Sequence, residues 1–325
     1  MHLRRDTPKV AVLLTSALLA ACGGSSDMSA SGPITLYTCA SDTTVGPVIE
    51  AFEEANPGTE VELYRATTGD LNARIAGDVR AGGLRADVVW ACDRLTMQDY
   101  VDQDLVGGWA PETDISSDYR AEDYVGVAVL YLVAVTRDGV APPTAWSDLT
   151  GSEYAGGVAL PDPGIAASAL GALGYFASNP DYGTDFYAAL EQNGATQLST
   201  PDDVVNGVAE GSYDAGITIA NSAYLAQDNG SPIETSWPTP GAVAVYGPIA
   251  IAQGQSDSET AQAFISYVAS EEGQTVIAES GSYPTLAGVP GPTKPEDAEI
   301  VSPDWSELSG DKEALLAEYQ NIFRG

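Results

Sequence analysis

An alternation of strand and helix patterns in the first third of the chain restricts its fold more than any other feature. Apolar runs alternate with residues at helical spacing, and Asn56-Pro57-Gly58 and Gly82-Gly83 mark helix ends. The pattern predicts a strand at 34–39, a helix at 45–55, a strand at 60–65, a helix carrying Leu71, Ile75 and Val79 on one face, and a strand at 86–91. A β-α-β-α-β order requires parallel strands joined by right-handed crossovers. The sequence therefore predicts an α/β fold built on a mainly parallel sheet.

A second strand-rich stretch begins near Val125 and continues this pattern. It predicts strands at 125–135, 158–160, 215–219 and 242–252, and helices at 165–176, 184–192, 201–210, 312–323 and twice within 258–280. Gly247-Pro248 is expected to break the last strand. No segment after Cys22 has the roughly 20 apolar residues that a membrane-spanning helix needs. The 325 residues suffice for one two-lobed unit or two ordinary domains.

The first residues have the pattern of an export signal. Three basic residues precede the apolar run 10–21, which is too short to span a bilayer but typical of a secretory signal. The ending Leu19-Ala20-Ala21-Cys22 resembles the lipobox of bacterial lipoproteins. We therefore expect residues 1–22 to be a lipoprotein signal peptide with lipidation at Cys22; the alternative is ordinary cleavage with an incidental cysteine. The Gly/Ser-rich residues 23–32 predict a flexible tether.

The charge of the chain excludes some partners. Without the signal, 10 basic and 45 acidic residues remain, so the net charge changes from −33 to −35. Nucleic acids and anionic membrane surfaces need basic patches on the protein that binds them, and neither is expected as a partner. A cationic ligand would suit this charge, but scattered acidic residues are also typical of a solvated surface at high salt or low pH.

The absence of histidine after the signal restricts the chemistry. His2 is the single histidine of the sequence, so Ser-His-Asp and Cys-His catalysis are excluded in the exported chain and the commonest zinc ligand is missing. The sequence also has no phosphate-binding Gly-x-x-x-x-Gly-Lys-Ser/Thr segment. We predict no catalytic residues, metal ligands or cofactor. The rival classes are a secreted hydrolase with a lysine or carboxylate base and a structural or adhesive lipoprotein.

Several segments, in this order and spacing, resemble one family. They are Ile34-Thr35-Leu36-Tyr37, Phe52-Glu53-Glu54-Ala55-Asn56-Pro57-Gly58, Ala86-Asp87-Val88-Val89-Trp90, residues 143–149, residues 154–163, residues 240–251, Glu271-Glu272-Gly273-Gln274 and Tyr283-Pro284. Together they resemble the substrate-binding proteins of ABC importers, in the ferric-iron-binding-like branch of the type II periplasmic binding proteins. The resemblance covers residues 34 to about 290. It implies two mixed, mainly parallel sheets, one per lobe, joined by a hinge with a ligand cleft between the lobes.

The resemblance also implies domain bounds and a function. Lobe one would comprise 33–130 and 248–325, and lobe two 131–247, with hinge crossings near 128–132 and 246–249. The chain would be a monomeric solute-binding component that captures a small polar ligand and delivers it to an ABC permease, without being an enzyme. It would be exported and lipid-anchored to the cell membrane, facing the periplasm or the cell exterior.

The candidate ligand-binding residues follow from the fold, because open α/β sheets bind ligands beyond the carboxyl ends of their strands, near helix N-termini. They are Ser41, Asp42, Thr43, Thr68, Gly69, Asp93, Arg94, Tyr131, Gly164, Ser168, Asn221, Ser222, Tyr224 and Tyr246. The hydroxyl groups could equally be helix caps, Arg94 a surface ion pair, and the tyrosines core residues.

The loops at these strand ends favour a ligand with a phosphonate, phosphate or carboxylate group, with Arg94 as its positive partner. Asp42, Asp93 and Asp162 could hold an ammonium group or only cap helices; with an ammonium bound there, a zwitterion fits both halves. The alternatives are a polyamine-like cation and ferric iron. Family members that hold iron directly use paired tyrosines where this chain has Asn221-Ser222, so tight iron binding is not expected.

The family topology also implies a disulfide. It makes the strands ending at Cys39 and Cys92 parallel neighbours, and these are the cysteines that remain once Cys22 is lipidated. The alternative is two buried free thiols, because free cysteine is commonly buried.

Overall fold

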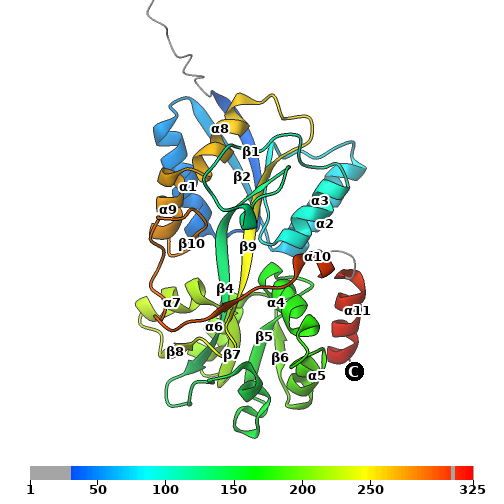
Figure 1. Cartoon of the computed structure of the whole chain (residues 1–325), viewed down its shortest axis with the longest axis vertical. Helices are drawn as coiled ribbons and strands as arrows, with labels where there is room; N and C mark the ends of the chain where they lie inside the picture. Colours follow the sequence, from blue (N-terminus) through cyan, green and yellow to red (C-terminus); the bar gives the residue numbers. More distant parts are fainter. Residues whose placement is uncertain (1–30, 309–311, 325) are drawn as a thin grey trace, which may run out of the picture.

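The computed structural model describes residues 31–308 and 312–324, so the predicted signal peptide and Cys22 lie outside the described residues. It has two α/β lobes connected by long strands (Figure 1). The first lobe contains β1 (Gly32–Thr38), α1 (Asp42–Ala55), β2 (Thr59–Arg65), α2 (Thr68–Arg80), β3 (Val88–Trp90), α3 (Arg94–Asp102), a short 3-10 helix (Ser117–Tyr119), α8 (Glu259–Val268) and α9 (Glu271–Glu279). Each strand and helix predicted over this part of the chain is present.

The second lobe repeats the alternation of strands and helices. It contains two short 3-10 helices (Trp146–Thr150 and Ser152–Tyr154), β5 (Val158–Pro161), α4 (Ala167–Ser178), α5 (Asp185–Gln192), β6 (Thr196–Leu198), α6 (Pro201–Ala209), β7 (Ala215–Ile219), α7 (Ala220–Asp228) and β8 (Ile233–Ser236). The long strands β4 (Val125–Arg137) and β9 (Ala242–Ile251) pass between the lobes. The chain ends with β10 (Tyr283–Pro284), β11 (Ile300–Val301), α10 (Trp305–Leu308) and α11 (Lys312–Phe323).

The strands form one continuous mixed sheet in the order β2-β1-β3-β9-β4-β7-β5-β6. Each lobe contributes a parallel triad, β2-β1-β3 in the first and β7-β5-β6 in the second. The antiparallel pair β9–β4 joins the two triads. We expected two sheets; the ladder is continuous because β4 is long enough to pair with β9 over Val125–Leu132 and with β7 over Leu132–Thr136. The prediction of an α/β two-lobed fold is confirmed.

Strand β9 is unbroken at Gly247-Pro248, so the predicted interruption is wrong. The irregularity lies in the partner strand, where the register shifts between Gly126 and Ala128. Proline lacks a backbone N–H and is tolerated inside a sheet next to a bulge. Glycine is needed at position 247, because a Cβ there would lie 2.8 Å from the carbonyl oxygen of Ala91.

Separate cores stabilise the two lobes. In the first lobe, Leu36, Phe52 and Phe264 are fully buried in one cluster. In the second, Trp146, Phe176 and Tyr319 belong to another. Tyr319 lies on α11, so the end of the chain packs on lobe two.

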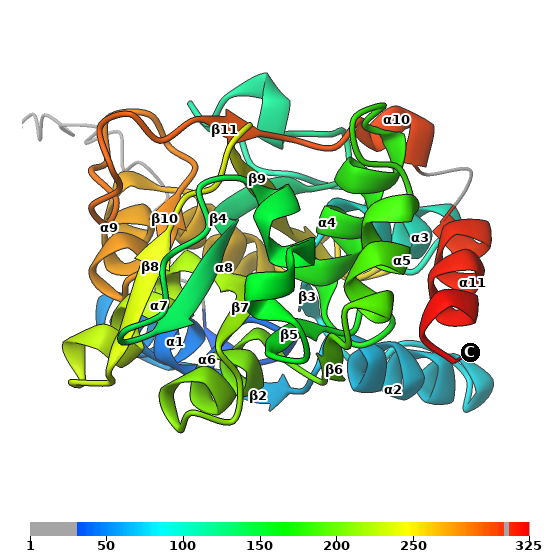
Figure 2. The same cartoon turned by 90° about the horizontal axis from the view of Figure 1, so that it is seen from below.

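This packing differs from the expected bounds, which placed all of residues 248–325 in lobe one. Leu315, Leu316, Ile322 and Phe323 of α11 also pack against the lobe-two core, and β11 pairs with the lobe-two half of β9. Figure 2 shows α11 alongside α5 and α10 near α4. The difference arises because the apolar face of α11 packs against the core of lobe two. Lys312 also forms an ion pair with Asp99 of lobe one, so this segment contacts both lobes.

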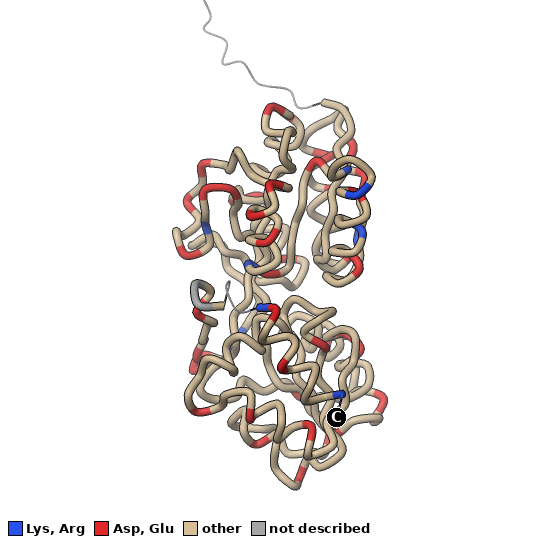
Figure 3. The backbone as a smooth tube through the Cα atoms, turned by 90° about the vertical axis from the view of Figure 1, so that its right-hand side faces the viewer, with Lys and Arg blue, Asp and Glu red and all other residues tan. Residues whose placement is uncertain are grey.

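Acidic residues occur along the backbone of both lobes, and basic residues are few (Figure 3). Within 31–308 and 312–324, none of the helices combines the length and the apolar character needed to cross a bilayer.

Candidate functional site

A cavity of about 130 Å³ lies between the lobes, at the carboxyl ends of the parallel strands. Its walls come from every loop that follows a strand of the two triads. The lining residues at these strand ends are Cys39, Ala40, Ser41 and Thr44 at β1, Arg65, Thr67 and Thr68 at β2, Trp90, Ala91 and Cys92 at β3, Ile165–Ser168 after β5, Thr200–Asp202 after β6, and Ile219, Asn221 and Ser222 at β7. This is where an open α/β sheet places a ligand, and here two such sheet edges face each other.

A wider and more open pocket of about 610 Å³ continues outward from this cavity. The two spaces share Ser41, Arg65, Asp202, Asn221 and Ser222. The outer pocket also contacts the carboxylates Asp42, Asp228 and Glu279 and the ring of Tyr224. The inner cavity therefore opens to solvent through the outer pocket, which is lined by several carboxylates.

Several helices begin at the inner cavity with open N-termini. The N-cap residues of α1, α4 and α7 make no side-chain cap hydrogen bond. By contrast, Thr67 and Thr200 cap α2 and α6 by accepting hydrogen bonds from Asp70 and Asp203. The free N–H groups and the positive end of the helix dipole at α1, α4 and α7 make this region favourable for an anion.

Hydroxyl groups supply further donors. Ser41 Oγ lies 3.0 Å from Thr44 Oγ1, which lies 2.7 Å from Ser282 Oγ, so one wall carries a chain of hydroxyls. Thr68 of the first lobe and Ser168 of the second both line the cavity and are only 9% and 3% exposed. Neither hydroxyl has a hydrogen-bond partner within the described part of the chain. Because both residues line the cavity, their hydroxyls are open to hydrogen bonding with a ligand.

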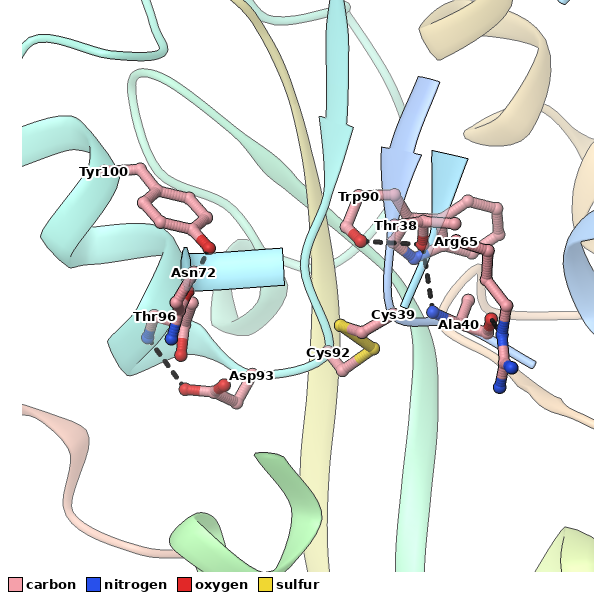
Figure 4. The surroundings of a disulfide bond; sticks show 10 residues. All are labelled: Thr38, Cys39, Ala40, Arg65, Asn72, Trp90, Cys92, Asp93, Thr96 and Tyr100. Carbon is pink, nitrogen blue, oxygen red and sulfur yellow. Dashed lines mark hydrogen bonds between the residues drawn. A yellow bond between two sulfur atoms is a disulfide. The ribbon is translucent and has the colours of Figure 1, made fainter. Parts of the chain in front are cut away.

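Arg65 is the positively charged residue that lines the inner cavity. It ends β2, and its Nε donates a 2.9 Å hydrogen bond to the carbonyl oxygen of Ala40 in the loop after β1 (Figure 4). Its Nη1 lies 3.6 Å from Asp42 Oδ2, and that carboxylate is 74% exposed. An ion pair with such an exposed partner is weak, so the guanidinium is held in place yet still open to a second anion.

The floor of the cavity contains a disulfide. Cys39 and Cys92 are bonded, with their Cα atoms 5.9 Å apart, at the ends of the parallel neighbours β1 and β3 (Figure 4). The predicted pairing is confirmed. The bond ties the loop that starts α1 to the loop that starts α3, and it lies beside the apolar side chains of Trp90 and Leu130.

The structure brings many of the predicted residues together. Ser41, Thr68, Ser168, Asn221 and Ser222 line the inner cavity. Asp42, Thr43 and Tyr224 line the outer pocket. Gly69 and Gly164 lie at a contact between the lobes, where a Cβ on Gly69 would be 3.3 Å from the carbonyl oxygen of Gly164. For all of these, the role in ligand binding stays a prediction.

Asp93 and Arg94 lie outside both spaces. Asp93 is fully buried and caps α3 by accepting a 2.8 Å hydrogen bond from the N–H of Thr96. Burial raises the pKa of its carboxyl. Arg94 donates to the hydroxyl of Tyr124 at 3.2 Å instead of lining the cavity. Asp93 thus serves as a helix cap, whereas Arg94 pairs with a tyrosine hydroxyl and, among the described residues, not with the acid expected of a surface ion pair.

Tyr131 and Tyr246 are packing residues. Tyr131 contacts Trp237 and Tyr283, and burial raises the pKa of its hydroxyl to about 12. Tyr246 is 5% exposed and packs edge-on against Tyr119. Neither lines the cavity or the outer pocket.

Sequence reasoning missed Arg65 and Asp202. Arg65 is the last residue of a correctly predicted strand, so its place at the sheet edge was a usable signal. Asp202 follows β6, which has only three residues and no alternation that a sequence pattern could reveal. Within the described residues, no three His, Cys, Asp or Glu side chains are grouped to hold a metal ion.

Comparison with known proteins places the chain in a family. A profile described as bacterial extracellular solute-binding protein matches residues 34–282. The spermidine/putrescine-binding periplasmic protein of Salmonella typhimurium is 28% identical over 228 residues, or 63% of this chain and 64% of that protein. The match thus spans slightly less than two thirds of the relative.

Solved structures share the fold. The periplasmic binding protein AfuA of Actinobacillus pleuropneumoniae, solved with bound fructose-6-phosphate, has a TM-score of 0.81 at 17% identity, covering 90% of this chain and 99% of that one. Iron-bound HitA of Pseudomonas aeruginosa has a TM-score of 0.76 at 18% identity, covering 89% and 99%. The chain belongs to the bacterial extracellular solute-binding protein family. The family resemblance inferred from the sequence is confirmed.

Proposed function

We propose that this chain is the solute-binding component of an ABC importer and that it captures a small solute carrying a phosphonate, phosphate or carboxylate group. The observation that carries the ligand class is the convergence of three uncapped helix N-termini and Arg65 on one inter-lobe cavity. Each terminus stabilises a nearby anion by about 0.3–1 kcal/mol, and more in partly buried geometry. The cavity has the volume for one small anionic group, and the outer pocket has room for the remainder of the solute.

The lobes would close on the solute by bending where β4 and β9 cross, near 128–132 and 246–249. Hinge closure around a bound ligand is a common domain motion. The closed monomer would then dock on a membrane permease and release its solute unchanged. No step in this cycle requires a catalytic residue.

A polyamine-like cation is the second candidate. Asp42, Asp202, Asp228 and Glu279 line the outer pocket, and the Salmonella relative is named for spermidine and putrescine. The inner cavity argues against this candidate, because Asp202 is the one carboxylate among its described lining residues, whereas Arg65 and the uncapped N-termini would repel an ammonium group. Ferric iron is a weaker candidate, since Asn221 and Ser222 at the cavity offer no anionic oxygen.

A thermal-shift screen tests the proposal. Phosphonates, sugar phosphates, carboxylates, spermidine and ferric salts would be compared at equal concentration. A solute that binds only the native state stabilises it by about 2.7 kcal/mol at a hundredfold excess over its dissociation constant. We expect an anion to give the largest rise in melting temperature. A rise with spermidine alone would contradict the anion proposal.

We also propose that the protein is exported and held at the membrane by lipid on Cys22. The support is the sequence pattern ending in Leu19-Ala20-Ala21-Cys22. Mass spectrometry of the membrane fraction should find a mature chain that begins at an acylated Cys22. An unmodified chain beginning elsewhere would refute the anchor.

A further inference from the structure

Arg65 and Asp202 occupy the junction between the inner cavity and the outer pocket. Both residues line both spaces. Arg65 ends β2 of the first lobe, and Asp202 lies in the first turn of α6 in the second. In the described part of the chain, the two side chains form no ion pair with each other. Beside the exposed Asp42 carboxylate, which lies 3.6 Å from Arg65 Nη1, the junction therefore presents the positive charge of Arg65 and the negative charge of Asp202 from opposite lobes.

Asp202 is not needed to cap its helix. The cap of α6 is formed by Thr200 and Asp203: the N–H of Asp203 donates to Thr200 Oγ1 at 3.1 Å, and the N–H of Thr200 donates to Asp203 Oδ2 at 3.0 Å. The carboxylate of Asp202 instead accepts a 2.5 Å hydrogen bond from Ser222 Oγ on α7. This bond fixes the carboxylate at the junction and leaves most of its acceptor capacity unused.

An ionised carboxylate only accepts hydrogen bonds. Opposite a fully deprotonated oxyanion such as sulfate, Asp202 would face acceptor oxygens and be repelled. Opposite an ammonium, a hydroxyl or an acid proton, it would form a charge-assisted hydrogen bond. The same residue therefore attracts one kind of anion and rejects another.

We propose that Asp202 is a specificity-determining residue, which selects solutes with a hydrogen-bond donor next to the anionic group and rejects bare oxyanions. This inference rests on the proposed function, because Arg65 and the helix N-termini must hold the anion. Together, Arg65 and Asp202 bind a dipolar solute across the closed cleft.

Calorimetry on the full chain tests the inference with three probes: 2-aminoethylphosphonate, inorganic phosphate near neutral pH, and sulfate. The first two carry a donor beside the anion and sulfate carries none. We expect the wild type to bind the first two and to bind sulfate weakly. In Asp202→Asn, affinity for 2-aminoethylphosphonate should fall by about tenfold or more, since a hydrogen bond to a charged group is lost, whereas affinity for sulfate should rise. Glu210→Gln, at the other end of α6, is the control for loss of one negative charge and should change neither affinity.

Two results would overturn the role of Asp202 while leaving the anion site in place. One is equal binding of all three probes by the wild type and Asp202→Asn. The other is a uniform rise in affinity for every probe in Asp202→Asn, which would indicate general repulsion. If none of the anions binds the wild type, the proposed function itself fails and the specificity role fails with it.

Discussion

The backbone N–H of Gly69 donates a 3.3 Å hydrogen bond to the carbonyl oxygen of Ile165, and this bond joins the first lobe to the second. Gly69 lies in the first turn of α2, and Ile165 lies in the loop that leads to α4. Both loops line the cavity. The lobes therefore touch at the edge of the proposed ligand site, and the size of residue 69 limits how closely they approach.

Gly69→Leu should hold the lobes apart. Even a Cβ at this position would lie 3.3 Å from the carbonyl oxygen of Gly164 and 3.6 Å from Ile165 Cα. We expect a larger radius of gyration than wild type in small-angle scattering and weaker binding of the anion found in the thermal-shift screen. Gly77→Leu on the same helix is the control, because a Cβ there meets only the end of Arg80 at 4.0 Å. A scattering curve for Gly69→Leu identical to that of wild type would show that this contact does not limit closure.

Removal of the Cys39–Cys92 disulfide should destabilise the first lobe. The bond joins cysteines that are 53 positions apart in the sequence. Losing such a cross-link lowers the free energy of unfolding by about 2–4 kcal/mol. The double variant Cys39→Ser, Cys92→Ser measures this loss by denaturant unfolding. Because the bond also fixes the loops at the cavity floor, we expect anion affinity to decrease as well. The prediction would be contradicted if the wild type is shown to be fully oxidised and the double variant is nevertheless equally stable.

Two glycine-to-alanine substitutions distinguish the effect of crowding on stability from the effect of helix propensity. A Cβ on Gly174 of α4 would overlap the side chain of Leu308 on α10, whereas a Cβ on Gly77 of α2 would meet only the end of the Arg80 side chain at 4.0 Å. Gly174→Ala should therefore lower the free energy of unfolding by about 1–3 kcal/mol. Gly77→Ala should raise it by about 0.5–1 kcal/mol, because alanine is the better helix former. Equal effects of both substitutions would mean that α10 does not pack against α4 as described.

The buried carboxyl of Asp93 should make stability depend on pH. Burial raises its pKa, Lys312 opposes that shift and Asp99 adds to it. The native state therefore holds this proton more tightly than the unfolded chain, so the native state loses stability as pH rises from about 4 through the raised native pKa. Asp93→Asn keeps an N-cap acceptor for Thr96 and removes the charge. The stability of this variant relative to wild type should increase over that pH range; parallel stability curves would refute the assignment.

The main strands and helices could be predicted from the sequence because regular alternation marks them, and the disulfide because the family topology makes the strands ending at Cys39 and Cys92 neighbours. The residues that line the candidate site were harder to predict than the fold. Arg94 and Arg65 both lie next to strand ends, but only the fold shows that Arg94 turns toward Tyr124 while Arg65 reaches the cavity. Asp202 follows a strand too short to give a pattern. The packing of α11 on lobe two depends on long-range contacts of Tyr319, which sequence spacing does not encode.

Calorimetric titration of Arg65→Gln measures how far anion binding depends on the guanidinium that lines the inner cavity. The probes are 2-aminoethylphosphonate and inorganic phosphate. Arg80→Gln is the control, because Arg80 is an exposed residue at the C-terminal end of α2 and lies outside the cavity. We expect Arg65→Gln to weaken binding of the anion by about tenfold to a hundredfold, the loss of a charge-assisted hydrogen bond, and Arg80→Gln to bind as wild type does. Equal affinities in wild type and Arg65→Gln, or tight binding of spermidine with no binding of either anion, would contradict the proposed anion site at Arg65.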